Sequence, residues 1–301
     1  MNPTSGAGRA GREWSAIESW LPQAGLQYEA VLTTRPLEAT EIAQNAVRQS
    51  RPVVVAVGGD GTLNEVVNGF FHNGAPTPTT TKLAMIPLGT GGDFRRTLRI
   101  PLDPKGAVQV LTTGLVRRLD AGCVTYQDHN GATAVRHFIN IADAGIGGEV
   151  VDNVNNGPKF LGGMTFTLAS LKALLTYKNK SMTVNVDGVS HDIVAQQVVI
   201  ANCQYFGGGM RMAPAASPSD GVFDVILVGD AGKLESISRL GSIREGKHLD
   251  DHNPKIQLMY GKRISITSPE KVRIDLDGEQ PGFLPALFEI QPGAIEFITP
   301  R

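Results

Sequence analysis

Blocks of apolar and polar residues along the first third of the chain predict helices and strands in turn. Apolar residues recur at intervals of three and four, as on one face of a helix, over residues 12–24, 37–50, 62–71 and 104–114. Between them lie short apolar runs without strict alternation, at residues 29–34, 53–57 and 82–88, and a polar loop at 72–81. Strands that are apolar on both faces and alternate with helices indicate a mostly parallel sheet covered by helices.

Beyond residue 117 the pattern changes to short strands separated by turn residues. We expect these strands at residues 120–126, 136–147, 182–188, 195–203, 222–229, 263–268, 272–278 and 294–300. Two helices interrupt them, at residues 163–178 and about 232–246. This spacing is typical of a β-sandwich or barrel. The sequence therefore predicts an α/β domain over residues 1–116 and a β-rich domain over 117–301, whose last residues could pack back on the first domain.

Composition narrows the class of protein without naming it. The 301 residues are 41% hydrophobic and 19% charged, with a formal net charge of −1, which disfavours nucleic-acid binding through bulk positive charge. Cys123 and Cys203 are far apart in apolar runs, so we expect buried thiols and no disulfide or zinc site. There is no run of 18 apolar residues and no charged-then-apolar leader, so we expect a cytoplasmic enzyme.

A glycine-rich turn joins the apolar run 53–57 to the next predicted helix. Gly58, Gly59 and Gly61 let a ligand approach the backbone, and the first turn of the helix offers free N–H groups to a phosphate. Asp60 lies among these amides, where a carboxylate repels phosphate unless a cation lies between them. The stretch therefore predicts a phosphate site that includes Mg²⁺, although a glycine-rich βα turn alone is also compatible with a purely structural role.

A second turn of the same kind follows the apolar run 82–88. It reads Gly89, Thr90, Gly91, Gly92, Asp93 and again leads into a helical pattern. Because the carboxyl ends of parallel strands meet at one edge of a sheet, we expect the two turns to lie together and to form a ligand site.

These motifs, in this order, resemble a known family. The stretches GGDGTLNEVVNG (58–69) and PLGTGGDFRRTL (87–98) look like the catalytic domain of the diacylglycerol kinase and sphingosine kinase superfamily, in its bacterial lipid-kinase branch. NPTSGAG (2–8), YFGGGMRMAPAASPSDGVFDVILVG (205–229) and RIDLDGEQPGFLPALFEIQPGAIEFI (273–298) are similar to its other motifs. The resemblance implies a phosphofructokinase-like first domain that binds ATP and a sandwich-like second domain that helps to form a lipid cleft.

The resemblance also implies roles for individual residues. Glu279 of the DLDGE motif would be the general base that accepts the proton of a lipid hydroxyl, and Asp60 and Asp277 would hold the catalytic Mg²⁺ and its waters. The positions that align with nucleotide contacts are Asn2, Pro3, Thr4, Ser5, Gly6, Thr33, Gly58, Gly59, Asp60, Gly61, Thr62, Leu63, Asn64, Gly89 and Thr90. Taken alone, DLDGE reads more simply as a hairpin turn with exposed acids.

A further Mg²⁺ site is implied in the stretch PSDGVFD of the second domain. Asp220 would supply its side chain, and Ser217 and Val222 their backbone carbonyls. An ordinary Asp-Gly turn is the structural alternative.

The sequence leaves three functions open. The leading hypothesis is an ATP-dependent kinase of a diacylglycerol-like or sphingoid-like alcohol, cytoplasmic and peripheral at the inner membrane surface. It would make transient contact with the membrane and would not bind nucleic acid; a homodimer stays open. The alternatives are an NAD kinase-like phosphotransferase, whose fold also uses a GGDGT turn, and a non-catalytic nucleotide- or lipid-binding protein.

Two departures from the family pattern concern the phosphate loops. Relatives carry an apolar strand directly before the NPTSG loop, whereas this sequence starts at Met1, so we expect a sheet with one strand fewer and weaker support for the loop. Gly92 stands where relatives more often carry Asn. We expect this change to tune the second turn and not to abolish it.

Overall fold

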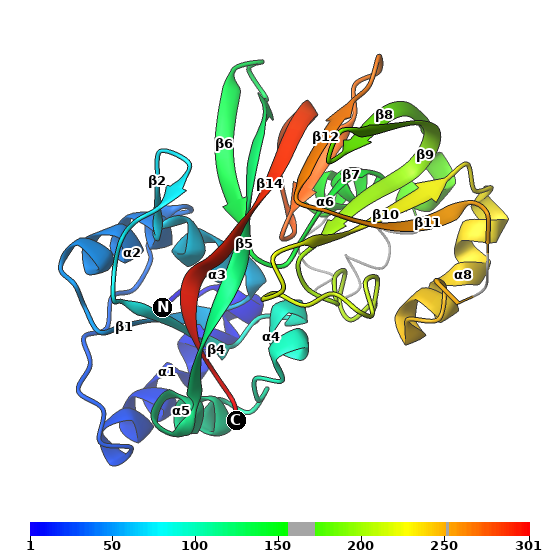
Figure 1. The fold of residues 1–301 in the computed structure, drawn as a ribbon. Coiled ribbons are helices and arrows are strands. Elements are labelled where there is room, and N and C mark those ends of the chain that lie inside the picture. Colours follow the sequence, from blue (N-terminus) through cyan, green and yellow to red (C-terminus); the bar gives the residue numbers. More distant parts are fainter. Residues whose placement is uncertain (156–171, 251–252) are drawn as a thin grey trace.

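Two long antiparallel strands, β5 (Leu115–Asp128) and β14 (Glu279–Thr299), run through the middle of the molecule. A computed structural model describes residues 1–155, 172–250 and 253–301. The pairing of β5 with β14 extends from Gly282 opposite Asp128 to Thr299 opposite Leu115. Figure 1 shows β14 passing from the strands of the second domain down to the helices of the first. Twelve strands of the described residues thereby form one continuous sheet.

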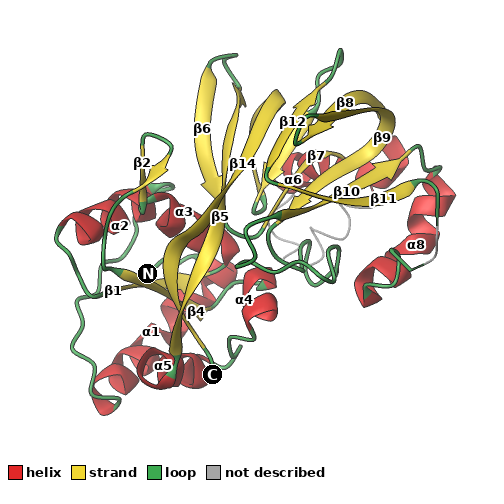
Figure 2. Cartoon of the chain, viewed as in Figure 1, coloured by secondary structure: helices red, strands yellow, loops and turns green. Residues whose placement is uncertain are grey.

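The first domain has the alternating α/β pattern that its sequence predicts. Its strands β1 (Val53–Gly58) and β4 (Lys82–Pro87) pair in parallel, and the end of β14 adds to β4 in parallel through Phe297 and Leu83. Helices contribute to the apolar core around this sheet (Figure 2). They are α1 (Ser5–Gln23), α2 (Glu38–Arg48), α3 (Asp60–Asn68), α4 (Asp93–Leu98) and α5 (Pro104–Thr113).

Three sequence predictions in this domain were wrong in detail. Residues 29–34 form no strand. This segment is joined to Met1 by two backbone hydrogen bonds, from Met1 N to Val31 O and from Thr33 N to Met1 O, and it pairs with no strand of the sheet among the described residues. The predicted loop 72–81 contains the short hairpin β2 (Phe71–His72) and β3 (Ala75–Pro76). Helix α1 starts seven residues earlier than expected, and its first turn includes the left-handed residues Gly6, Ala7 and Gly8.

The second domain is rich in strands, as predicted. Besides β5 and β14 its strands are β6 (Thr133–Phe138), β7 (Ile141–Gly145), β8 (Lys180–Val186), β9 (Val189–Ala201), β10 (Phe223–Gly229), β11 (Ile256–Gly261), β12 (Arg263–Thr267) and β13 (Arg273–Leu276). Side chains from most of these strands meet in one apolar core. The order β14-β12-β8-β9-β10-β11 shows that non-sequential strands are neighbours, which local pattern does not reveal.

The helices of the second domain were predicted in part. Helix α8 (Lys233–Glu245) coincides with the expected helix at 232–246. Helix α6 (Ile146–Asn155) and strand β11 were missed. Most of the helix predicted at 163–178 lies outside the described residues. In the part that is described, residues 172–176 are helical. Over the part of the chain that is described, no helix is long and apolar enough to cross a bilayer.

The predicted boundary near residue 117 falls inside β5. Because β5 continues without interruption from Leu115 to Asp128, the chain passes between the two domains on a strand and not on a linker. The division into residues 1–116 and 117–301 therefore stays a prediction.

Two carboxylates face each other on adjacent strands beneath α6. Asp143 on β7 pairs directly with Asp275 on β13, and the Asp143 side chain is 0% exposed. A Cβ added at Gly147 would lie 2.1 Å from Asp143 Oδ2, so α6 begins immediately above the pair. Burial raises the pKa of Asp143 to about 7, against the opposing effects of Gln197 and the Gly148 N–H, and burial together with the charge of Asp143 raises that of Asp275. The two groups therefore hold at least one proton at neutral pH.

We predict that Asp143→Asn makes folding less sensitive to pH. Folded Asp143 keeps a proton that the unfolded chain loses near pH 3.8, so the free energy of unfolding falls as pH rises from about 4 to about 7. The amide variant has no proton to lose. Its melting temperature should exceed that of the wild type by about 5 °C at pH 8, with a difference that shrinks toward pH 4. Asp192→Asn, at an exposed position of β9, is the control. A difference in melting temperature between Asp143→Asn and the wild type that does not change with pH would contradict the raised pKa of Asp143.

Candidate active site

The two glycine turns touch each other at one edge of the sheet. Gly58 pairs with Pro87 at the ends of β1 and β4, and Leu88 N donates to Gly58 O at 2.7 Å. A Cβ added at Gly89 would lie 2.4 Å from the Cα of Gly59, so neither turn has room for a side chain at this contact. The expectation that both turns lie together is confirmed.

The NPTSG loop joins these turns through side-chain hydrogen bonds. Asn2 Nδ2 donates to Thr62 Oγ1 at 3.1 Å, and the Ser5 and Thr62 hydroxyls are 3.1 Å apart. Gly6 has φ 60°, and a Cβ there would lie 2.2 Å from Leu88 O. Because its hydroxyl is engaged in this way, Thr62 joins the first loop to α3.

A cavity of about 310 Å³ opens where the three loops converge. It is lined by Asn2, Ser5, Gly6, Gly59, Asp60, Gly61, Thr62, Glu65, Gly89, Thr90, Gly91 and Glu279. Nine of the predicted nucleotide contacts are among these residues. The cavity also lies at the N-terminus of α3, where the first N–H groups of a helix attract anions.

The remaining predicted nucleotide contacts do not line the cavity. Leu63 and Asn64 are 1% and 0% exposed and point into the protein. Thr33 is bonded through its backbone to Met1. Pro3, Thr4 and Gly58 are neighbours of lining residues and support the loops. Direct contact between ATP and these six positions is therefore not favoured by the geometry.

Asp60 ties the first turn to the second. Its Oδ2 accepts from Asp93 N at 3.0 Å and its Oδ1 from Phe94 N at 3.3 Å, at the start of α4. Burial raises the pKa of this carboxyl, partly offset by these backbone donors. Each oxygen retains a lone pair, and the residue lines the cavity, so Asp60 is suited to bind a cation or a water on that cation.

Asp93 forms a second carboxylate link that the sequence did not single out. Its Oδ2 accepts from Gly208 N in the second domain at 2.8 Å, and Arg96 lies 3.7 Å from its Oδ1. Burial raises the pKa of Asp93 to about 6, with the charge of Asp60 contributing. The preceding residue, Gly92, has φ 63°, a left-handed conformation that both Gly and Asn adopt readily, so the backbone of this turn is compatible with either residue.

Asp277 is clamped by four N–H donors. Its Oδ1 accepts from Asn140 N at 2.9 Å and Ile141 N at 3.1 Å. Its Oδ2 accepts from Ile139 N and Asn64 Nδ2, both at 2.9 Å. Since these bonds use the lone pairs of both oxygens, the geometry favours a positioning role for Asp277 over the direct Mg²⁺ ligand that we expected.

Of the four donors to Asp277, Asn64 is the one that belongs to the first domain. Its Nδ2 also donates to His137 O at 3.0 Å, and its Oδ1 accepts from Arg136 Nη2 at 2.7 Å. The amide is therefore fully occupied between α3 and the second domain. The sequence reveals its position, on the buried face of α3, but not that its partners lie more than 70 residues away.

Glu279 reaches the cavity from the second domain. A Cβ added at Gly61 would lie 3.3 Å from Glu279 Oε1, so the carboxylate stands over the N-terminus of α3. Desolvation raises the pKa of Glu279, against the attraction of Arg136 and with the repulsion of Glu65. Glu65 also lines the cavity, was missed from the sequence, and accepts from Ala39 N at 3.2 Å.

The predicted second metal site lies on a turn held to β5 and β14. Asp120 Oδ2 accepts from Gly221 N at 2.8 Å and its Oδ1 from Gly293 N at 2.7 Å. Asp220 lies near enough to buried Asp224 to help raise the pKa of that carboxyl to about 6, and Asp224 Oδ2 is buried without a hydrogen-bond partner. A cation on this turn would offset the repulsion between Asp220 and Asp224 and would give the buried Asp224 Oδ2 a partner. The residues therefore fit the expected ion. Within the described residues, no three His, Cys, Asp or Glu side chains gather as a metal cluster, so backbone carbonyls such as those of Ser217 and Val222 would have to complete the site.

The fold and cavity together define a phosphotransferase-type protein, in which three loops at a sheet edge meet an acid from a second domain. Residues 1–124 match the family model for the diacylglycerol kinase catalytic domain, and residues 140–299 match that for the YegS C-terminal NAD kinase beta sandwich-like domain. The chain belongs to the diacylglycerol kinase family and is a lipid kinase.

Known proteins resemble the chain over its whole length. It is 32% identical to a diacylglycerol kinase of Bacillus subtilis, covering 100% of this chain and 95% of the relative. A diacylglycerol kinase of Staphylococcus haemolyticus is 31% identical, covering 100% and 87%. A solved structure of a candidate diacylglycerol kinase from Bacillus anthracis has a TM-score of 0.79 at 25% identity, covering 99% and 94%. These matches do not favour the NAD kinase-like or non-catalytic alternatives.

We predict that Asn64→Asp impairs catalysis while preserving side-chain shape. The new carboxylate would stand about 2.9 Å from Asp277 Oδ2 and repel it. Displacing the adjacent Glu279 by about 1 Å should lower kcat by about 100-fold. Kinase assays should show this fall with little change in the KM for ATP, whereas Asn45→Asp, at an exposed position of α2, should behave as wild type. An unchanged kcat would rule out the positioning role of Asn64.

Proposed function

We propose that this protein transfers the γ-phosphoryl group of ATP to the hydroxyl of diacylglycerol. The observation that carries the proposal is the meeting of Glu279 with the three glycine-rich loops in one cavity. The relatives named above are diacylglycerol kinases, which supports this lipid over a sphingoid-type amino alcohol.

The nucleotide phosphates would lie over the NPTSG loop and the turns at Gly59 and Gly89. The α3 N-terminus supplies N–H donors, and glycine allows the phosphates to approach the backbone. The first domain would thus serve as a phosphofructokinase-like ATP-binding domain. Mg²⁺, bound through Asp60 or a water on it, would neutralise charge on the phosphates.

Glu279 would act as the general base. A lipid hydroxyl attacks phosphorus more readily as its proton passes to a positioned carboxylate. The raised pKa of Glu279 makes its carboxylate a stronger base than a glutamate of ordinary pKa. Because only the ionised form accepts a proton, activity should rise with pH through the pKa of this group.

The substrate also implies the surroundings in which the enzyme works. Diacylglycerol resides in a bilayer, so the protein would bind transiently at the inner membrane surface as a peripheral protein. Homodimerisation is a separate expectation, to be tested by the mass of the protein in solution.

We predict that Glu279→Gln abolishes most phosphoryl transfer without affecting ATP binding. Loss of a general base lowers kcat by about 10²–10⁴-fold, and the rise of activity with pH should disappear with it. Transfer of labelled phosphate from ATP would be measured with diacylglycerol, a sphingoid-type amino alcohol and NAD as acceptors. Glu289→Gln, on the same strand, is the control. Wild-type transfer to NAD but to neither lipid would overturn the proposed substrate, and an active Glu279→Gln would overturn the base.

We predict that Mg²⁺ stabilises the second domain through Asp220. In the absence of nucleotide, Mg²⁺ should raise the melting temperature of the wild type relative to EDTA by a few degrees, since a ligand that binds only the folded state stabilises it. Asp220→Asn should lose most of this rise, because the turn then lacks its side-chain ligand. Asp230→Asn, an exposed position after β10, should retain it. An equal Mg²⁺ response in Asp220→Asn would exclude the site.

A further inference from the structure

Three large apolar side chains are exposed in a row on helix α8. Leu234, Ile237 and Leu240 are 84%, 37% and 40% exposed and recur every three residues, so they share one side of the helix. Leu175 is exposed too and adjoins them, because Lys233 Nζ donates to its carbonyl oxygen. We call these four side chains the apolar row.

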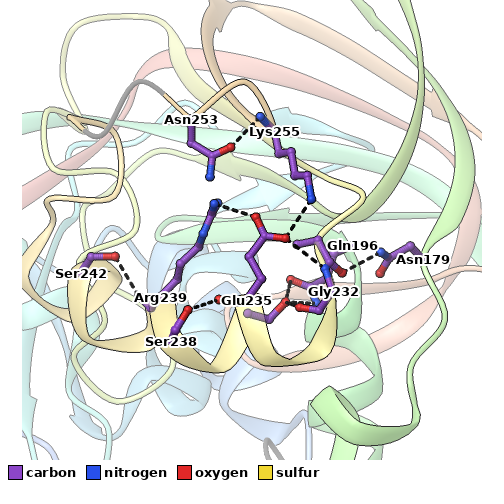
Figure 3. Close-up of polar contacts among 11 residues, drawn as sticks. Asn179, Gln196, Gly232, Glu235, Ser238, Arg239, Ser242, Asn253 and Lys255 are labelled. Atoms are coloured by element: carbon purple, nitrogen blue, oxygen red, sulfur yellow. Dashed lines mark hydrogen bonds and ion pairs between the residues drawn. The ribbon is translucent and has the colours of Figure 1, made fainter.

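The opposite side of α8 attaches the helix to the domain. Figure 3 shows Glu235 between Arg239 and Lys255, and the bonds measure 2.7 Å to Arg239 Nη2 and 2.8 Å to Lys255 Nζ. Ser236 is bonded to Gln196 on β9, and Ile243 packs on an apolar cluster beneath the helix. These contacts hold α8 in place from the side opposite the apolar row.

Positive charge surrounds the apolar row. Lys172, Lys178, Lys233 and Arg244 lie on or beside α8, and none of them forms an ion pair with any described residue. The acids of the helix are neutralised, since Glu235 is paired as above and Glu245 lies 2.7 Å from Lys247. Even with exposed Asp230 just before the helix counted, this surface is cationic, although the whole chain has a net charge of −1.

We propose that the outer face of α8 docks on an anionic lipid bilayer. Apolar side chains on a helix, flanked by Lys and Arg, partition into the boundary between headgroups and acyl chains, and the cations attract anionic headgroups. The proposal rests on the lipid-kinase function, which brings the protein to a bilayer, and it assigns the surface that makes the contact. Unpaired cations on either side of the apolar row favour an anionic bilayer over a second copy of this nearly neutral chain.

Vesicle flotation tests the docking surface without relying on catalysis. The wild-type chain should float with phosphatidylcholine vesicles that contain phosphatidylglycerol and much less with phosphatidylcholine alone. Leu234→Ser/Leu240→Ser should lower binding to the anionic vesicles by about ten-fold. Lys233→Glu/Arg244→Glu should remove the preference for anionic vesicles. The controls Val189→Ser, 61% exposed on β9, and Lys105→Glu, exposed on α5, should float as wild type.

Activity on two forms of substrate separates docking from chemistry. The α8 variants should match the wild type on a short-chain diacylglycerol dissolved below micelle formation and fall about ten-fold on diacylglycerol in anionic vesicles. Unchanged flotation of both α8 variants would overturn the proposal. The proposal would also be overturned if the α8 variants floated as the wild type does but formed a smaller oligomer than the wild type. That result would identify a second copy of the chain as the occupant of this surface. If flotation follows the predicted pattern while no lipid is phosphorylated, the docking surface holds and the proposed substrate fails.

Discussion

The clamp on Asp277 is the interaction on which the arrangement of the active site depends. Four N–H groups hold one carboxylate, three from the backbone at residues 139–141 and one from Asn64 on α3. The same residue has φ 53°, a left-handed conformation that Asp adopts more readily than most residues, and these bonds stabilise it there. Because Glu279 follows two residues later, the clamp fixes the proposed general base in the second domain relative to helix α3, which begins at the first glycine turn.

The long strands β5 and β14 hold the two domains, and with them Glu279 and α3, in a fixed relative position. β5 and β14 belong to both domains, and Asp120 bonds the 217–222 turn to a bulge in β14. A linker between two separate sheets would let the domains rotate, and only side-chain bonds such as Asn64–Asp277 and Asp93–Gly208 would resist that motion. A shared sheet distributes the constraint over many ladder bonds between β5 and β14.

The local sequence pattern predicted elements that depend on residues close in sequence. It missed contacts between residues that are far apart in sequence. The strands at 53–57 and 82–88, the glycine turns after them and helix α8 follow from periodicity and turn residues, and the family motifs located Glu279 at the cavity. The strand expected at 29–34 failed because an apolar run needs a ladder of partners. Asp277 looked like a metal ligand in sequence, yet its lone pairs are taken by donors about 137 residues away. Glu65 was missed, and Asp93 was recognised only as part of the second turn, because their contacts depend on loops that only the fold brings near.

The charge of the cavity determines how a nucleotide can be bound there. Among the described residues that line it there is no Lys, Arg or His, whereas Asp60, Glu65 and Glu279 are acidic. A P-loop neutralises phosphate with a lysine, but here a bare triphosphate would meet three carboxyl groups. Desolvation already disfavours the charged form of two of them, Asp60 and Glu279, and raises their pKa. Backbone N–H groups at the α3 terminus supply only partial charges. We therefore expect phosphate binding in this cavity to require a divalent cation. The cation would lie between Asp60 and the phosphates and would leave Glu279, the proposed general base, free to accept a proton.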